Sequence, residues 1–396
     1  MGSTPSSGIR RVLHMTNPSI SSSQDHSADR AAVLRGVRSV VIKIGTNALS
    51  DATGHLDTAL LAHFAQQVAA LHAKKIQVTM VSSGAIGAGV TELRLPGRPK
   101  DLPMLQAAAS VGQSILMNLF AEAFRPHHLH VGQILVTRSD VEEWSRYLNL
   151  RNCISALHGV NAIPIINEND SVAVAEIRFG DNDLIAAQIT SLVGADLLIL
   201  LSVVDGLLDG EGKTIPLVQD VDDVAGNVDD TRKSIGGSGG MGSKLAAADI
   251  VKTAGEPVLI ANGKRPNIIT ELLNGSDSGT LILPAPKRLS SRSRWIALTA
   301  RNRGTLVVDD GAAKALRNNK SLLATGIVSA EGDFAAGDAV LITDKHAKPI
   351  ARGLINYARA ELDLIRGHKT SEFSRLLNTE TYYDEVIHRD DLVPEN

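Results

Sequence analysis

The stretch Ser39-Val40-Val41-Ile42-Lys43-Ile44-Gly45 decides the fold of this chain. Its apolar, mostly β-branched residues are typical of a strand that is covered on both faces. Apolar residues at helical spacing follow over residues 57–74, and a second apolar run follows over residues 76–81. Because strand and helix patterns keep alternating, the sequence predicts an α/β fold with a mainly parallel sheet sandwiched by helices.

The same alternation continues for most of the chain. Further strands are expected at residues 131–137, 163–166, 196–201 and 257–261, and further helices at residues 102–124, 146–158, 183–193 and 243–254, with another opening at 83–89. In parallel sheets, ligands bind beyond the carboxyl ends of the strands. The polar residues at such ends are Lys43, Ser83, Asn167 and Ser202.

A chain of 396 residues is long enough for two domains. Residues 1–37 are predicted to be a flexible N-terminal arm, because their Ser, Pro, Gly and charged residues form no apolar face. Residues 38–298 would form the α/β domain, and residues 299–396 a small β-barrel-like domain with a C-terminal tail. The short strands expected there are residues 305–308, 326–329, 339–342 and 349–353.

Composition excludes several classes of function. The net charge of -3 gives no global basic field that would recruit nucleic acid, and 3% aromatic residues offer few surfaces for stacking bases. No apolar run is long enough for a signal peptide or a membrane span, so no membrane association is expected. The single cysteine, Cys153, cannot form an intramolecular disulfide, which suits a cytoplasmic location.

Two polar stretches, Asn167-Glu168-Asn169-Asp170 and Gly180-Asp181-Asn182-Asp183, begin thirteen residues apart. The first follows an apolar strand pattern, and the second opens a helix pattern. Asp and Asn side chains at such places can hold an ammonium group, while helix N–H groups attract a carboxylate or phosphate. Either stretch alone could serve only to cap helices and shape turns. Together they favour a polar binding pocket.

A glycine-rich segment, Gly236-Gly237-Ser238-Gly239-Gly240-Met241-Gly242-Ser243-Lys244, leads directly into a helix pattern. Its backbone N–H groups can converge on an anion, and Lys244 adds a full positive charge. Lys43 is its natural partner, because a lysine inside an apolar strand is costly to bury unpaired. The alternatives are a flexible linker for the glycines and a surface-reaching side chain for Lys43.

The order of these motifs resembles the glutamate 5-kinase family, a branch of the amino-acid kinases. The matching segments are 41–46, 81–86, 166–170, 180–183 and 239–244, and the resemblance extends roughly over residues 38–390. The tail from about residue 303 is similar to a PUA domain. Other amino-acid kinases generally lack that domain, so the pairing favours this branch.

The resemblance implies that ATP phosphorylates the γ-carboxylate of L-glutamate to γ-glutamyl phosphate, the first step of proline biosynthesis. It implies ATP and Mg²⁺ as cofactors, proline as a feedback inhibitor, and a homodimer or homotetramer. Two alternatives stay open: a kinase of the same fold acting on another carboxylate or on carbamate, and an RNA-binding protein acting through the PUA-like domain. The basic residues of that domain are Arg301, Arg303, Lys314, Arg317 and Lys320.

Motif positions also imply roles for individual residues. Ser83, Asp170 and Asn182 would bind glutamate, in a pocket also lined by Gly84 and Asn167. Lys43 and Lys244 would hold the transferring phosphoryl group, and Asp183 would orient both lysines. The other nucleotide contacts would come from Gly45, Ser202, Val203, Gly239, Gly240, Met241, Gly242 and Ser243. No residue is expected to bind a metal ion directly.

One position departs from the family pattern. Where the family commonly has Thr-Asp or Ser-Asp beside the nucleotide, this chain has Ser202-Val203. An apolar side chain therefore replaces a carboxylate, which bears on nucleotide affinity or base preference. Asp205 could compensate for the lost carboxylate, or could serve only in the turn that precedes Gly206.

Overall fold

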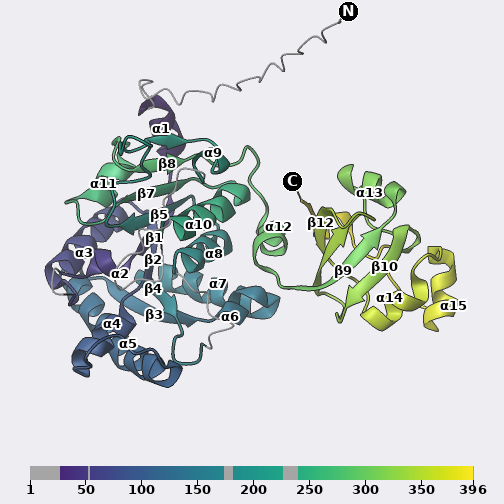
Figure 1. The fold of residues 1–396 in the computed structure, drawn as a ribbon, viewed down its shortest axis with the longest axis horizontal. Coiled ribbons are helices and arrows are strands. Elements are labelled where there is room, and N and C mark those ends of the chain that lie inside the picture. Colours follow the sequence, from purple (N-terminus) through teal and green to yellow (C-terminus); the bar gives the residue numbers. More distant parts are fainter. Residues whose placement is uncertain (1–26, 52–53, 174–181, 226–239, 396) are drawn as a thin grey trace, which may run out of the picture.

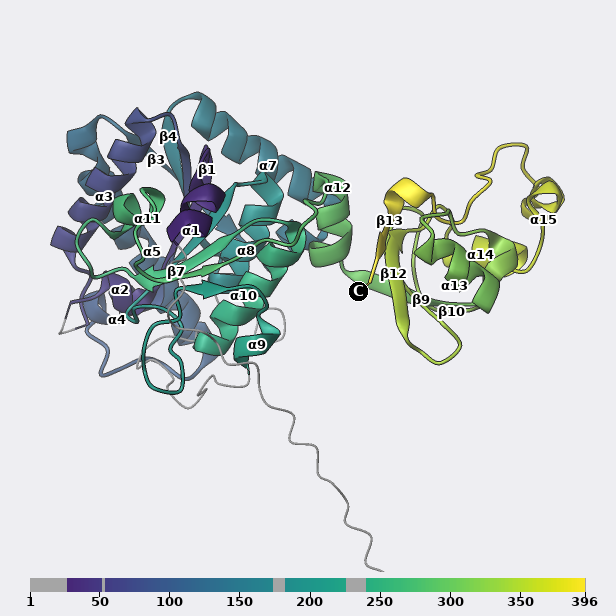
Figure 2. The same cartoon turned by 90° about the horizontal axis from the view of Figure 1, so that it is seen from above.

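The computed structural model describes residues 27–51, 54–173, 182–225 and 240–395, which form two layered units (Figure 1). The first unit is built on an eight-stranded sheet and the second on a five-stranded sheet. Seen from above, helix α12 lies between the two units (Figure 2). None of the helices in these described ranges combines the length and the apolar character needed to cross a membrane.

The large sheet has the strand order β3-β4-β2-β1-β5-β7-β8-β6. Every neighbouring pair in it is parallel except β7 with β8, so the predicted mainly parallel sheet is confirmed. The strands are β1 (Ser39–Ile44), β2 (Gln77–Ser82), β3 (His130–Val136), β4 (Ala162–Glu168), β5 (Leu197–Ser202), β6 (Leu217–Val218), β7 (Val258–Asn262) and β8 (Thr280–Ile282).

Helices cover both faces of this sheet. One face packs against α3 (Thr58–Ala73), α5 (Leu102–Phe124) and α11 (Ile268–Leu273), and the other against α7 (Trp144–Gly159), α8 (Asn182–Val193) and α10 (Met241–Ala254). The shorter helices of this unit are α2 (Thr46–Leu49), α4 (Ala85–Glu92), α6 (Arg138–Glu142) and α9 (Asp222–Ala225).

The alternation of side chains along β1 decides where Lys43 points. Val40, Ile42 and Ile44 belong to the core under α3 and α5, whereas Val41 belongs to the core under α8 and α10. Successive side chains of a strand point to opposite faces. Lys43 therefore lies on the same face as Val41, toward α8 and α10.

Residues 27–34 of the predicted flexible arm, residues 1–37, are ordered in the structure. Residues 27–34 form helix α1 (Ser27–Leu34), and the Arg30 side chain is fully buried. The Arg30 guanidinium donates hydrogen bonds to the carbonyl oxygens of Pro216 (2.6 Å) and Ser278 (2.7 Å). These bonds satisfy a buried cation and attach α1 to the sheet unit. Residues 1–26 lie outside the described part of the chain.

The C-terminal unit has its own apolar core and the strand order β10-β9-β11-β12-β13. The four predicted strands are present as β9 (Asn302–Val308), β10 (Ile327–Gly332), β11 (Ala339–Thr343) and β12 (Pro349–Leu354). The sequence patterns missed the last strand and the helices of this unit: β13 (Leu392–Pro394), α13 (Asp310–Arg317), α14 (Arg359–Ile365) and α15 (Phe373–Leu377).

A short connector, α12 (Ser291–Arg294) continued by one helical turn (Trp295–Thr299), joins the units. The Trp295 ring packs against Trp144, and its indole nitrogen donates to the carbonyl oxygen of Val141 (3.1 Å). Arg294 is ion-paired with the buried carboxylate of Glu256. The predicted domain boundary between residues 298 and 299 falls inside this connector.

Candidate active site

The site lies where the central strands of the large sheet end. Strands β4, β2, β1 and β5 are consecutive neighbours and parallel, so their carboxyl ends meet at one edge. Lys43 lies near the end of β1, Ser83 directly follows β2, and Asn167 and Ser202 lie at the ends of β4 and β5. The predicted placement of these four residues at strand ends is confirmed.

Asp183 bridges two lysines from different parts of the chain. The Lys43 ammonium nitrogen is 2.6 Å from Asp183 Oδ1, and the Lys244 ammonium nitrogen is 2.9 Å from Asp183 Oδ2. Asp183 is fully buried, and the two lysines are 4% and 6% exposed. The first turn of α8, the first turn of α10 and the end of β1 thus converge on one carboxylate. We call these three residues the Lys–Asp–Lys bridge.

The bridge brings two lysines and one carboxylate together in a buried environment. Burial alone would raise the pKa of Asp183, but the charges of Lys43 and Lys244 outweigh burial and lower that pKa. One carboxylate therefore stays ionised between the two lysine side chains. Two ammonium groups held at one carboxylate are suited to an anion that arrives from solvent.

The glycine-rich segment reaches the bridge through the start of α10. Gly240 precedes the first helical residue, Met241, in an extended conformation. The Ser243 hydroxyl lies 3.2 Å from Asp183 Oδ2 and 2.9 Å from the Gly240 carbonyl oxygen, so its single proton serves one of these acceptors at a time. The N–H groups of this first turn have no partner within the helix and can face an anion. Gly239 lies outside the described residues.

A second cluster, next to the bridge, contains neutral polar side chains. The Asn182 amide nitrogen lies 2.7 Å from Ser83 Oγ, 3.1 Å from Asn167 Oδ1 and 3.0 Å from the Ser82 carbonyl oxygen. Asn182 precedes Asp183 in α8, so one helix start serves both clusters. Gly84 follows Ser83 with a left-handed φ of 106°, a conformation that favours glycine, and directly precedes the first residue of α4.

Asp170 lies on the loop beyond β4, three residues after Asn167, and its side chain is half-buried. Asn167 is the residue of the first polar stretch that the structure joins to the Asn182 cluster. Asp181 and Gly180 of the second stretch lie outside the described residues. The roles of Ser83, Gly84, Asn167, Asp170 and Asn182 in binding stay predictions.

The predicted nucleotide side of the site includes the ends of β1 and β5. A Cβ atom on Gly45 would lie 3.6 Å from the Lys43 nitrogen, so the glycine leaves space in front of that ammonium group. Val203 is 42% exposed, an open apolar surface directly after Ser202. Asp205 Oδ1 accepts a hydrogen bond from the Asn262 amide (3.1 Å), which ties this turn to the end of β7.

Gln113, in the middle of α5, is a site residue that was not predicted from the sequence. Its side chain is 9% exposed, and its Oε1 accepts a hydrogen bond from the Asn167 amide nitrogen (2.9 Å). The sequence pattern that could have indicated Gln113 is its helical spacing from two other polar residues, Gln106 and Ser110. That pattern alone does not distinguish a solvent-facing stripe from a buried one.

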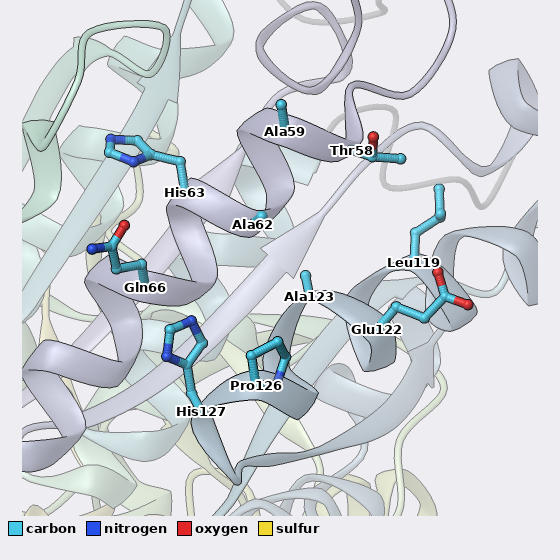
Figure 3. A pocket seen from close by; sticks show the side chains of 10 residues that line it. All are labelled: Thr58, Ala59, Ala62, His63, Gln66, Leu119, Glu122, Ala123, Pro126 and His127. Carbon is cyan, nitrogen blue, oxygen red and sulfur yellow. The ribbon is translucent and has the colours of Figure 1, made fainter.

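The structure also contains a hollow that is unrelated to these residues (Figure 3). It has a volume of about 560 Å³ and lies between α3 and the C-terminal half of α5. Its polar lining residues are Thr58, His63, Gln66, Glu122 and His127. None of the residues predicted to bind glutamate or ATP lines it, so hollow shape alone does not point to the Lys–Asp–Lys bridge.

Comparison with known proteins agrees with this geometry. The amino acid kinase family model matches residues 38–262, and the PUA domain model matches residues 304–377. The chain therefore belongs to the amino acid kinase family.

Its relatives within that family are glutamate 5-kinases, and the chain belongs with them. The glutamate 5-kinase of Thermoanaerobacter sp. (strain X514) is 42% identical over 361 residues, covering 89% of this chain and 97% of the relative. That of Syntrophus aciditrophicus (strain SB) is 43% identical over 372 residues, covering 92% and 96%. That of Geobacter sulfurreducens is 42% identical over 371 residues, covering 92% and 99%. The expected resemblance, with its PUA domain, is confirmed.

Proposed function

We propose that this chain transfers the terminal phosphoryl group of ATP to the γ-carboxylate of L-glutamate, giving γ-glutamyl phosphate for proline biosynthesis. The observation that carries the proposal is the buried Lys–Asp–Lys bridge beside the Asn182 cluster. The bridge offers positive charge to a phosphoryl group, and the cluster offers hydrogen bonds to an amino acid. Membership of the glutamate 5-kinases supports this choice of substrate.

The chemistry matches the residue types. A carboxylate is already a nucleophile, so the reaction needs no strong general base. It needs in-line placement of the reactants and neutralisation of charge on the transferring phosphoryl group. Lys43 and Lys244 supply that charge, and Asp183 holds their ammonium groups at fixed positions before ATP arrives. Such preorganised charge acts most strongly in a water-poor site.

Glutamate would bind on the other side of the α8 start. Asp170 is suited to the substrate ammonium group, and the Ser83 hydroxyl and Asn182 amide can donate to its carboxylates. Asn182 Oδ1 is buried without a hydrogen-bond partner among the described residues, so it offers a further acceptor. This arrangement would place the γ-carboxylate between Asn182 and the bridge.

Mg²⁺ would enter with ATP. Mg²⁺ prefers oxygen ligands, keeps several waters, and is commonly held by substrate phosphates with one or two carboxylates. Among the described residues no group of three or more His, Cys, Asp and Glu side chains forms a metal cage, and both Asp183 oxygens contact lysines. Phosphate oxygens and water would therefore supply most ligands. When bound, Mg²⁺ neutralises part of the phosphate charge.

Three further properties go with this proposal. Proline, like glutamate, carries an α-carboxylate and a protonated α-nitrogen, although its nitrogen is a secondary ammonium in the ring, so Asp170 and Asn182 could hold it as an inhibitor. A homodimer or homotetramer and a cytoplasmic location are also proposed, the latter supported by the single cysteine. RNA binding through the PUA domain stays an alternative. Its basic residues are exposed, as most surface charges are: Arg301, Arg303, Lys314, Arg317 and Lys320.

The proposal is tested with the full-length chain, ATP, Mg²⁺ and hydroxylamine, which traps acyl phosphates as hydroxamates. Glutamate, aspartate, acetylglutamate and carbamate are offered separately. We expect hydroxamate with glutamate alone. No product with glutamate would contradict the proposal, and product with another acid instead would support the alternative of a same-fold kinase with a different substrate.

A further inference from the structure

One face of α5 carries three polar residues, Gln106, Ser110 and Gln113, which we call the α5 stripe. Their spacing of four and three residues places them on the same side of the helix. The segment at residues 167–173, which includes the end of β4 at Asn167 and the following loop with Asp170, lies against this side. The stripe is thus next to residues that the proposed function assigns to glutamate.

Each stripe residue holds a different part of that segment. Gln113 Oε1 accepts from the Asn167 amide nitrogen (2.9 Å) at its start. The Ser110 and Ser171 hydroxyls are 2.8 Å apart, and the Gln106 amide donates to the Ala173 carbonyl oxygen (3.2 Å) at its end. The segment at residues 167–173 is therefore attached to one helix at three points.

Glycines fix α5 against the opposite side of the pocket. A Cβ atom on Gly112 would lie 1.8 Å from the Ala85 carbonyl oxygen, and one on Gly89 would lie 1.8 Å from the Ala108 carbonyl oxygen. The backbones of α4 and α5 therefore touch. Since α4 begins directly after Ser83 and Gly84, α5 connects the Ser83 side of the pocket with the Asp170 side.

Gln113 has a particular effect on Asn167. Asn167 Oδ1 accepts from the Asn182 amide and from the Glu168 backbone N–H, so the Asn167 nitrogen must face the other way. It meets Gln113 Oε1 there, and Asn167 is only 2% exposed. The Gln113 carbonyl therefore fixes the orientation of the Asn167 amide. A line of hydrogen bonds runs from Gln113 through Asn167 and Asn182 to Ser83.

We propose that the α5 stripe, and Gln113 above all, is a positioning element that sets the affinity for glutamate. This inference rests on the proposed function. Loss of the stripe would loosen Asn167 and Asp170 without moving the Lys–Asp–Lys bridge. Those residues hold the substrate equally in the ground state and the transition state, so the KM for glutamate should rise while kcat is largely kept.

The test replaces Gln113 by methionine, which has a similar length and no hydrogen-bonding amide. Gln67→Met is the matched control, because Gln67 is another buried glutamine, 2% exposed, whose Oε1 accepts from the Ile269 backbone N–H (2.8 Å). We expect Gln113→Met to raise the KM for glutamate about 10-fold, with kcat and the KM for ATP changed less than about 3-fold. Gln67→Met should lower the melting temperature and leave the KM for glutamate unchanged.

A second measurement does not depend on activity. The backbone N–H groups of Asn169, Val172 and Ala173 are hydrogen-bonded within the structure. Their hydrogen exchange should accelerate in Gln113→Met and not in Gln67→Met. If Gln113→Met does not fold, Ser110→Ala replaces it, with the same expected directions and an unchanged melting temperature.

The outcomes separate this inference from the proposed function. Wild-type hydroxamate formation with glutamate tests the function, whereas loop exchange tests the positioning role even in an inactive protein. Unchanged loop exchange would overturn the inference. An unchanged KM for glutamate, or an equal rise in both KM values, would overturn it as well.

Discussion

Replacing Asp183 by asparagine tests the physical basis of the site most sharply. The change keeps the size of the side chain but removes the charge that holds Lys43 and Lys244 together. Both ammonium groups would stay buried, and the new amide could accept a hydrogen bond from only one of them. Breaking a buried ion pair by removing one partner typically costs about 3–5 kcal/mol, because a buried charge is left uncompensated.

The expected loss in the free energy of unfolding is therefore about 3–5 kcal/mol. For a domain of this size that corresponds to a fall in melting temperature of roughly 6–20 °C. Urea unfolding and calorimetry without ATP measure both quantities. Because the lysines also lose their fixed positions, we expect kcat to fall by at least about 10²-fold in the same variant.

Asp220 provides the control. It forms an ion pair with Lys252 at 3.0 Å, but its side chain is 58% exposed. Exposed pairs contribute about 0–1 kcal/mol, so Asp220→Asn should change stability by less than about 1 kcal/mol. An equally small effect of Asp183→Asn would refute the reasoning that burial of the Lys–Asp–Lys bridge makes it indispensable.

Three further predictions concern the same site. Lys43→Ala and Lys244→Ala should each lower kcat by at least about 10²-fold, because each ammonium acts mainly in the transition state; near-normal kcat in either purified, folded variant would exclude that role. Asp170→Ala should chiefly raise the KM for glutamate, and steady-state kinetics showing an unchanged KM would count against the ammonium contact. The lowered pKa of Asp183 means that its stabilising effect is present above the unfolded value of about 3.9 and is lost as pH falls through the folded pKa. The stability difference between wild type and Asp183→Asn, followed by urea unfolding from pH 7 to pH 3, should therefore shrink below about pH 4, and a constant difference would contradict it.

Much of the fold follows from local patterns. The apolar run at residues 39–45 became a strand buried on both faces, and the helix expected at residues 102–124 has those bounds in the structure. Such segments are long or strongly apolar, so their pattern determines their structure. Helix α1 was missed because its attachment depends on Arg30 and on carbonyl oxygens about 190 to 250 residues away.

The charged residues of the site were easier to predict from the sequence than Gln113, which positions the neighbouring Asn167. Lys43, Asp183 and Lys244 stand out in sequence because charges next to apolar or glycine-rich segments require partners. Gln113 does not stand out, since a glutamine on a helix usually faces solvent. Its burial results from the contact of Gly112 with Ala85, which brings α5 within hydrogen-bonding distance of Asn167. The burial of Gln113 can therefore be recognised only from the three-dimensional packing of α4 against α5.

Glutamate-dependent hydroxamate formation, compared between wild type and Lys244→Met, tests the central claim most directly. Methionine is an unbranched side chain of similar length that removes the charge and the hydrogen-bond donors of the ammonium group. We expect ATP-dependent product from glutamate with the wild-type chain and at least about 10²-fold less with the folded variant. Equal product from both would show that the charge of Lys244 does not stabilise phosphoryl transfer, and no product from the wild type would contradict the proposed glutamate kinase activity.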